Sequence, residues 1–197
     1  MPSGVAVDFG GTKIAAARIA DGIVGNILTE QTDGNADASG QVNSICRLLN
    51  QLELLPHEKV AVAVAGRIDD HGNWIALNTE TLSGFDRVPL GEILSKRLQR
   101  NVTLFNDATA AAVGEFVAGA GRKTRSMAFI TVSTGVGGGI IFDGKPLMSA
   151  SGLAGHIGFT TSRIASGICG SGRRQTVENI ASGRAISAQA ADLGFTG

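Results

Sequence analysis

Two glycine-rich segments constrain the fold of this chain more than any other feature of its 197 residues. Residues 8–13 have the sequence DFGGTK, and residues 131–139 have the sequence TVSTGVGGG. Each lies between two short runs of β-forming residues, and a hairpin turn seldom needs more than one or two glycines. The repeated plan of strand, glycine-rich turn and strand predicts a duplicated α/β fold with two similar halves around a cleft.

The rest of the sequence alternates between strand and helix patterns. Expected strands, rich in small and β-branched apolar residues, cover residues 5–9, 14–20, 23–29, 60–65, 102–105, 127–133 and 139–142. Expected helices cover residues 41–55, 89–98 and 108–118, and Cys46 lies beside the apolar stripe of the first, so we expect it in the core. The second glycine-rich turn is expected at 134–138. A polar connector after residue 118 divides the expected domains, 1–118 and 119–197.

Charge, apolar runs and cysteine content exclude several classes of protein. The chain has 17 basic and 17 acidic residues, and the small basic cluster at 122–125 lacks aromatic neighbours, so nucleic-acid binding is not favoured. The longest clean apolar run, 60–65, is far shorter than the ~20 residues of a membrane-spanning helix. Cys46 and Cys169 do not form a disulfide framework. We expect a cytoplasmic protein that binds a small molecule, with no nucleic acid or membrane partner.

Both glycine-rich segments carry groups suited to binding phosphate. Backbone N–H groups of glycines can close around phosphate oxygens, while a threonine adds a hydroxyl and a lysine adds a positive charge. Asp8 would face an accompanying Mg²⁺ through water. Neither segment has the GxxxxGK[ST] pattern or opens a helix as a dinucleotide fingerprint does, and a plain hairpin turn is the alternative for the first segment alone. The candidate nucleotide-binding residues are Asp8, Gly10, Gly11, Thr12, Lys13, Ser133, Thr134, Gly135, Gly137, Gly138 and Gly139.

Two polar pairs follow expected strands. Asn106 and Asp107 precede an Ala-rich helix, where an aspartate can cap the helix or act as a general base. The two roles are compatible, because the helix N-terminus holds a capping carboxylate in place and favours its ionised form. Gly66 and Arg67 follow the strand at 60–65, at the carboxyl end where open α/β sheets bind ligands. A surface arginine is the alternative for Arg67.

Taken together, these segments resemble the ROK family of bacterial sugar kinases and repressors. The resemblance rests on residues 8–13, 106–112 (NDATAAA), 131–139 and 152–158 (GLAGHIG). It implies the actin-like ATPase fold, which is ribonuclease H-like. The 152–158 segment, with His156 where glucose kinases usually carry Glu, is similar to the N-acetylmannosamine kinases of the family.

The resemblance implies transfer of the ATP γ-phosphoryl group, with Mg²⁺, to the 6-hydroxyl of N-acetylmannosamine, a step of sialic acid catabolism. Asp107 would be the catalytic base. Gly66, Arg67, Asn106, Asp107, His156 and Glu178 would contact the sugar, although His156 could be structural and Glu178 a solvated helix residue. Glucose or N-acetylglucosamine as acceptor, or a truncated non-catalytic sugar-binding relative, remain alternatives.

The same resemblance carries expectations about the extent of the chain. ROK repressors have a DNA-binding segment ahead of the first phosphate loop, and only seven residues precede Asp8 here, so we expect a kinase. ROK kinases usually continue beyond the position of Gly197 with a segment that packs on adenosine. We therefore expect an incomplete second domain and weak ATP binding by these residues alone. ROK proteins are commonly dimers, which makes a homodimer the implied assembly.

Most ROK kinases bind a structural zinc ion through a Gly-His dipeptide and three later cysteines. The corresponding dipeptide here is Gly158-Phe159, and the cysteine positions are Cys169, Ser171 and Thr176. Phenylalanine cannot ligate zinc, and neutral hydroxyls are poor ligands for it. We therefore expect no structural zinc, with the loop at 160–176 held by packing in which Phe159 supplies an apolar contact.

Overall fold

A computed structural model describes residues 3–77, 82 and 85–195, and these residues form two compact units. The first unit contains the described residues up to 107 together with 150–152. The second contains residues 108–149 and the described residues from 153 onward. The division between the units falls at the start of a helix, and the domain boundary after residue 118 stays a prediction.

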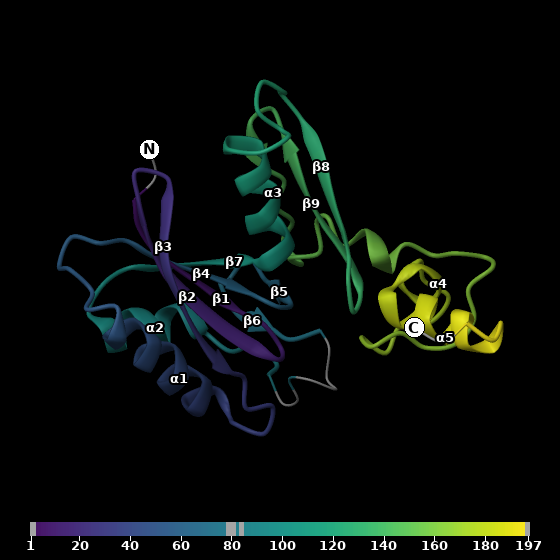
Figure 1. Cartoon of the computed structure of the whole chain (residues 1–197), viewed down its shortest axis with the longest axis horizontal. Helices are drawn as coiled ribbons and strands as arrows, with labels where there is room; N and C mark the ends of the chain where they lie inside the picture. Colours follow the sequence, from purple (N-terminus) through teal and green to yellow (C-terminus); the bar gives the residue numbers. More distant parts are fainter. Residues whose placement is uncertain (1–2, 78–81, 83–84, 196–197) are drawn as a thin grey trace. The chain divides into compact units, whose positions relative to one another are not determined.

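The first unit is built on a five-stranded sheet with the order β3-β2-β1-β4-β7 (Figure 1). The first three strands form an antiparallel meander, β4 pairs in parallel with β1, and β7 pairs in parallel with β4. The strands are β1 (Gly4–Phe9), β2 (Lys13–Ala20), β3 (Ile23–Gln31), β4 (Val60–Val64) and β7 (Val102–Asn106). Alternating apolar residues account for β1, in which Val5, Val7 and Phe9 are buried.

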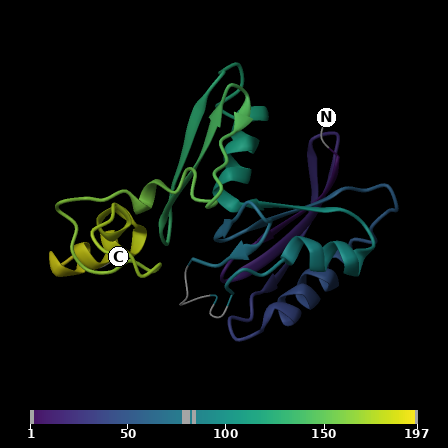
Figure 2. The ribbon, with the colours of Figure 1, turned by 180° about the vertical axis from the view of Figure 1, so that it is seen from behind.

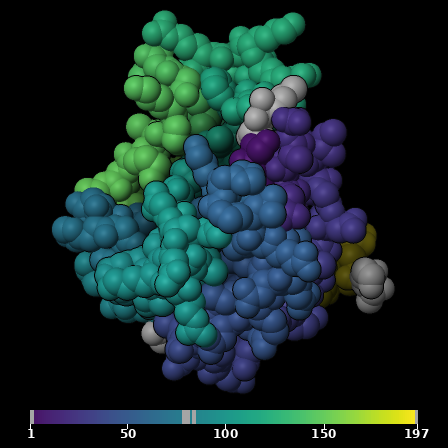
Figure 3. Space-filling view, turned by 90° about the vertical axis from the view of Figure 1, so that its left-hand side faces the viewer, coloured from purple at the N-terminus to yellow at the C-terminus, as the bar shows by residue number. Residues whose placement is uncertain are grey.

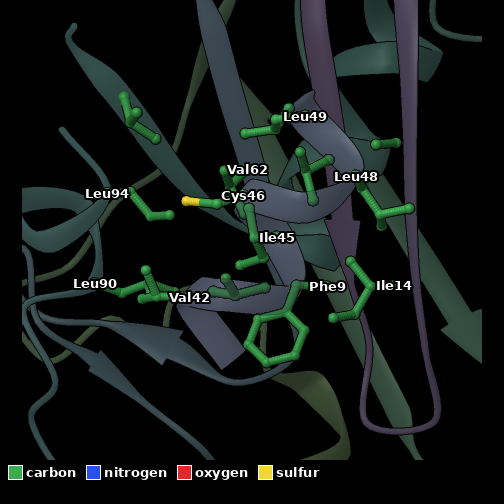
Figure 4. Packing of buried hydrophobic residues seen from close by; sticks show 14 of the residues in the cluster. Phe9, Ile14, Val42, Ile45, Cys46, Leu48, Leu49, Val62, Leu90 and Leu94 are labelled. Carbon is green, nitrogen blue, oxygen red and sulfur yellow. The ribbon is translucent and has the colours of Figure 1, made fainter. Parts of the chain in front are cut away.

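Helices α1 (Ala38–Gln51) and α2 (Leu90–Leu98) lie on one face of this sheet (Figures 1 and 2). Helix α1 begins at residue 38 rather than 41, because the Asp37 carboxylate accepts a hydrogen bond from the Gly40 backbone N–H at 2.8 Å and caps the helix. It also ends before the expected residue 55. The core between α1, α2 and the sheet contains Phe9, Ile45 and the predicted buried Cys46 (Figure 4), and burial raises the pKa of that thiol. In the space-filling view, side chains close the spaces between these elements (Figure 3).

A short hairpin of β5 (Arg67–Ile68) and β6 (Trp74–Ile75) was not predicted from the sequence. Its Trp74 is fully buried, with its ring centroid 5.2 Å from that of Phe9 and 4.8 Å from that of Phe85. The indole N–H donates to the Ala65 carbonyl oxygen at 2.9 Å. The hairpin therefore closes the core at the end of β4.

The second unit contains a three-stranded sheet with the order β10-β9-β8. Its elements are α3 (Asp107–Val117), β8 (Met127–Val132), β9 (Val136–Phe142), β10 (Lys145–Pro146), the 3₁₀ helix η1 (Ile157–Phe159), α4 (Glu178–Ala181) and α5 (Gly183–Asp192). The predicted start of the last long strand at residue 139 is wrong, because β9 begins at Val136. Gly137, Gly138 and Gly139 pair with β8, so the turn is confined to 133–135.

Close packing explains two of these glycines, Gly138 and Gly139. A Cβ built on Gly139 would lie 2.7 Å from both the Ala108 carbonyl oxygen and the Ala112 Cβ of α3. A Cβ on Gly138 would lie 2.6 Å from the Phe129 carbonyl oxygen. Glycine at these two positions thus reflects the close approach of neighbouring segments of the chain.

Corresponding strands of the two units differ in what covers them. Strands β1 and β8 both precede glycine-rich turns and carry apolar residues, but Val7 is 2% exposed whereas Ile130 is 60% exposed. We expect Val7→Thr to lower the free energy of unfolding by about 1–3 kcal/mol, because it buries a hydroxyl at unchanged volume. Ile130→Thr is expected to change it by less than about 0.5 kcal/mol. Urea denaturation of both variants checks this, and equal losses would contradict the burial difference.

Candidate functional site

The carboxyl ends of three parallel strands bring candidate residues to one edge of the first sheet. Phe9, Val64 and Asn106 are neighbours across β1, β4 and β7. The segments that follow these residues, 10–13, 65–67 and 107, therefore leave the sheet at the same edge. This is where open α/β sheets bind ligands.

The Asn106 side chain connects two of these segments. Its Nδ2 donates to the Gly66 carbonyl oxygen at 2.6 Å and to Asp107 Oδ1 at 2.8 Å. Gly66 has a φ of +124°, and a Cβ there would collide with the Ile75 carbonyl oxygen, so the position requires glycine. Asn106 is the last residue of β7, and Asp107 is the first of α3 and exposed. The arrangement orients a carboxylate at the N-terminus of α3.

Arg67 is held rather than free on the surface. Its Nη1 donates to the Ser151 carbonyl oxygen at 2.5 Å, and residues 150–152 belong to the same unit. Gly152 adopts a φ of +70° close against the Ile68 backbone. The segment at 150–152 thus fixes one guanidinium nitrogen of Arg67. Sugar contact by Gly66, Arg67 and Asn106 stays a prediction.

The first glycine-rich segment is closed by a residue that the sequence analysis missed. Gly10 N–H donates to the Lys13 carbonyl oxygen at 3.0 Å. Thr32 Oγ1 donates to the Gly10 carbonyl oxygen at 2.8 Å, and Thr32 N–H donates to the Thr12 carbonyl oxygen at 3.0 Å. Thr12 and Lys13 are exposed, so their hydroxyl and ammonium groups are accessible to a ligand. No local signal marks Thr32, because its role depends on β3 returning beside β2.

Asp8, the first residue of this segment, has a carboxyl group whose ionised form is disfavoured in the folded chain. Asp8 is exposed as a residue, but burial around its carboxyl group raises the pKa, while the positive charge of Lys13 opposes that rise. The ionised form is therefore less stable in the folded chain than in the unfolded chain. A bound cation would relieve this cost, which fits the predicted role of Asp8 beside Mg²⁺.

We expect Asp8→Asn to stabilise the fold at neutral pH. A raised folded-state pKa means that the protonated carboxyl favours folding, and this contribution is lost as pH rises through the folded-state pKa of Asp8. The melting temperature of Asp8→Asn should therefore exceed that of the parent at pH 7, with the difference shrinking as pH falls through that pKa. Asp192→Asn, at the exposed end of α5, is the control. A variant less stable than the parent at pH 7 would contradict the expected direction.

The second glycine-rich segment is held by the chain that follows it. Glu178 Oε2 accepts a hydrogen bond from the Val136 N–H at 2.9 Å, and the Gly183 N–H donates to the Ser133 carbonyl oxygen at 2.7 Å. A Cβ on Gly135 would lie 2.5 Å from Glu178 Oε2. One carboxylate oxygen of Glu178 thus holds the glycine turn, a role that the sequence analysis did not foresee. Its predicted sugar contact stays a prediction, as do the nucleotide contacts of the glycine-rich segments.

The loop expected to lack zinc is closed by backbone pairing. Thr161 pairs with Thr176 and Ile168 with Arg174 as isolated bridges, and Cys169 Sγ lies 3.0 Å from Ser171 Oγ. Across residues 3–77, 82 and 85–195, no three His, Cys, Asp or Glu side chains are grouped as metal ligands. The absence of zinc stays a prediction. None of the helices in these residues is long and apolar enough to cross a bilayer.

The model of the ROK family matches residues 4–194 of this chain. The chain belongs to the ROK family. It is 42% identical to the N-acetylmannosamine kinase of Escherichia coli (strain SMS-3-5 / SECEC) over 187 residues, which are 94% of this chain and 63% of that protein. It is 40% identical to the N-acetylmannosamine kinase of Pasteurella multocida (strain Pm70) over 187 residues, 93% of this chain and 61% of that one.

A solved relative shares the fold. The ROK family glucokinase from Streptomyces griseus, in complex with glucose and AMPPNP, matches with a TM-score of 0.83 and 32% identity, covering 98% of this chain and 62% of that chain. This likeness confirms the predicted α/β fold of the actin-like ATPase type. The chain spans about three fifths of the length of the curated relatives that it matches.

Proposed function

We propose that the protein carrying this chain transfers the γ-phosphoryl group of ATP to the 6-hydroxyl of N-acetylmannosamine. The observation that carries the proposal is the link from the Gly66 carbonyl oxygen through Asn106 Nδ2 to Asp107 Oδ1. This link orients a carboxylate at the same sheet edge as the first glycine-rich segment.

Asp107 accepts the proton of the attacking hydroxyl in this mechanism. As the proton leaves, the sugar oxygen forms a bond to the γ-phosphorus, and the bond from that phosphorus to the β–γ bridging oxygen breaks. ADP and the sugar 6-phosphate are the products. Asn106 donates a hydrogen bond to Asp107 Oδ1 and thereby orients the carboxylate.

The residues present fit a bound nucleotide with its magnesium ion. The exposed Thr12 and Lys13 offer a hydroxyl and a positive charge, and burial around the carboxyl group of Asp8 raises its pKa. Magnesium, when bound, would neutralise charge on the phosphates during transfer. Asp8 would hold it through water, as proposed from the sequence.

The names of the two curated relatives and the presence of His156 favour N-acetylmannosamine as acceptor. Glucose is the second candidate, because the Streptomyces griseus relative was solved with glucose. Steady-state kinetics with N-acetylmannosamine, N-acetylglucosamine and glucose test the choice. We expect the highest kcat/KM for N-acetylmannosamine, and a higher value for glucose would overturn the proposed acceptor.

The proposed setting is the cytoplasm, with a small amino sugar and ATP as partners and no nucleic acid or membrane partner. Two free cysteines, Cys46 and Cys169, fit a reducing compartment. A homodimer is the proposed assembly, and light scattering of the purified protein tests it.

A further inference from the structure

A long loop connects two of the residues proposed to contact the sugar. It begins after η1, the short helix that follows His156, and ends at Glu178, the first residue of α4. Val177 N–H donates to the Thr160 carbonyl oxygen at 2.9 Å, and Ser162 N–H donates to the Gln175 carbonyl oxygen at 2.8 Å. The two ends of the loop, which we call the 160–177 loop, therefore run side by side.

Three side chains stack where this loop begins. The His156 and Phe159 rings lie 5.6 Å apart between centroids with 25° between their planes. Arg173 approaches from the returning part of the loop, with Cζ 4.1 Å from the centroid of the Phe159 ring. The guanidinium is attracted by the ring face, so Phe159 contacts a cation and an imidazole at once.

Local geometry explains the ring pair. The Phe159 N–H donates to the His156 carbonyl oxygen at 3.1 Å, which is the spacing of a 3₁₀ turn. Residues three apart in such a turn have eclipsed side chains, so His156 and Phe159 are aligned by the backbone. The contact with Arg173 has no such local origin, because it needs the loop to fold back.

We propose that Phe159 and Arg173 are positioning residues that hold the His156 imidazole in the orientation needed to contact the sugar. This inference rests on the proposed function. The ring plane of a histidine decides where its two nitrogens point, and a stacked neighbour restricts rotation of that plane. Since Arg173 belongs to the returning part of the 160–177 loop, ordering of this loop and affinity for the sugar are coupled.

The stack can be measured without any ligand. The chain has three histidines, so His156→Gln assigns the His156 ring-proton resonances in an NMR spectrum. We expect these resonances to be shifted upfield by the Phe159 ring current, to lose that shift in Phe159→Leu, and to keep it in Phe159→Tyr. Arg173→Ala should move or broaden them. Arg174→Ala is the matched control, because Arg174 is adjacent and exposed.

The consequence for the sugar is measured by steady-state kinetics of the protein that carries this chain. Phe159→Leu and Arg173→Ala should raise the KM for the sugar by about 5- to 20-fold, with kcat changed by less than about twofold. Phe159→Tyr should keep the parental KM for the sugar, because it keeps the aromatic face. If Phe159 were needed only for folding, its replacement would alter the kinetics with ATP and with the sugar together. Arg174→Ala should match the parent.

Two results would show that Phe159 and Arg173 do not position His156. His156 resonances unchanged in Phe159→Leu, or a parental KM for the sugar in both variants, would overturn the positioning role. If Phe159→Leu does not fold, the positioning role is tested by comparing the KM for the sugar of Arg173→Ala with that of the control Arg174→Ala. If the parent protein phosphorylates no hexose or amino sugar, the proposed function is wrong, and so is the role of Phe159 and Arg173 in sugar binding. The ring-proton shifts of His156 test separately whether the stack exists.

Discussion

Replacing Asp107 with asparagine is expected to lower kcat by about 100- to 10,000-fold, because the amide cannot accept the proton of the attacking hydroxyl. The substitution keeps the side-chain shape, and the amide oxygen can still accept the hydrogen bond from Asn106 Nδ2. The free energy of unfolding should therefore stay close to that of the parent. Activity and urea denaturation, measured on the same preparation, separate loss of chemistry from loss of structure.

Glu115→Gln is the matched control for this substitution. Glu115 is a carboxylate of the same helix, α3, and its Oε2 accepts a hydrogen bond from the Ala120 N–H at 2.9 Å, which a glutamine oxygen can also do. We expect parental kcat in this control. Near-parental turnover in Asp107→Asn would remove Asp107 from the mechanism.

The second large effect is expected at Gly139, where α3 packs directly on β9. A Cβ there would lie 2.7 Å from the Ala108 carbonyl oxygen and 2.9 Å from the Thr109 Cα, so the first turn of α3 would have to move. We expect Gly139→Ala to lower the free energy of unfolding by about 2–3 kcal/mol, the cost of overpacking against backbone. Because that turn carries Asp107, kcat should fall as well.

Gly137→Ala is the matched comparison for stability. Its Cβ would lie 3.4 Å from Thr131 Cγ2 and 3.8 Å from the Ala108 Cβ, which are ordinary packing distances. We expect its free energy of unfolding to stay within about 0.5 kcal/mol of the parent. Equal losses in the two variants would show that close packing under α3 is not what requires glycine in β9.

Periodic patterns in the sequence predicted most of the sheet and its covering helices. The alternation at Val5, Val7 and Phe9 and the helical stripe through Ile45 and Leu49 follow from burial of one face, which is a local signal. The predicted ends of helices and strands were less accurate. The start of α1, for example, depends on a hydrogen bond from the Gly40 N–H to the Asp37 carboxylate.

The errors arose where distant parts of the chain decide the structure. Gly137 and Gly138 of β9 were assigned to a turn, because the sequence does not show that Gly138 packs against the Phe129 and Gly155 carbonyl oxygens. Thr32 binds the first glycine-rich segment from the end of β3, and Trp74 fills the core from a hairpin of two-residue strands. The candidate residues Asn106 and Asp107 were identified, but the hydrogen bond from Asn106 to Gly66 joins positions 40 residues apart.

Phosphorus NMR of the reaction product tests the central claim most directly. The protein that carries this chain would be incubated with ATP, Mg²⁺ and N-acetylmannosamine, and the product examined for coupling between phosphorus and sugar protons. We predict a phosphomonoester coupled to the two protons on C6, formed together with ADP and strongly reduced in Asp107→Asn. Phosphate attached at another carbon, or ADP formed with free inorganic phosphate and no sugar phosphate, would contradict the account.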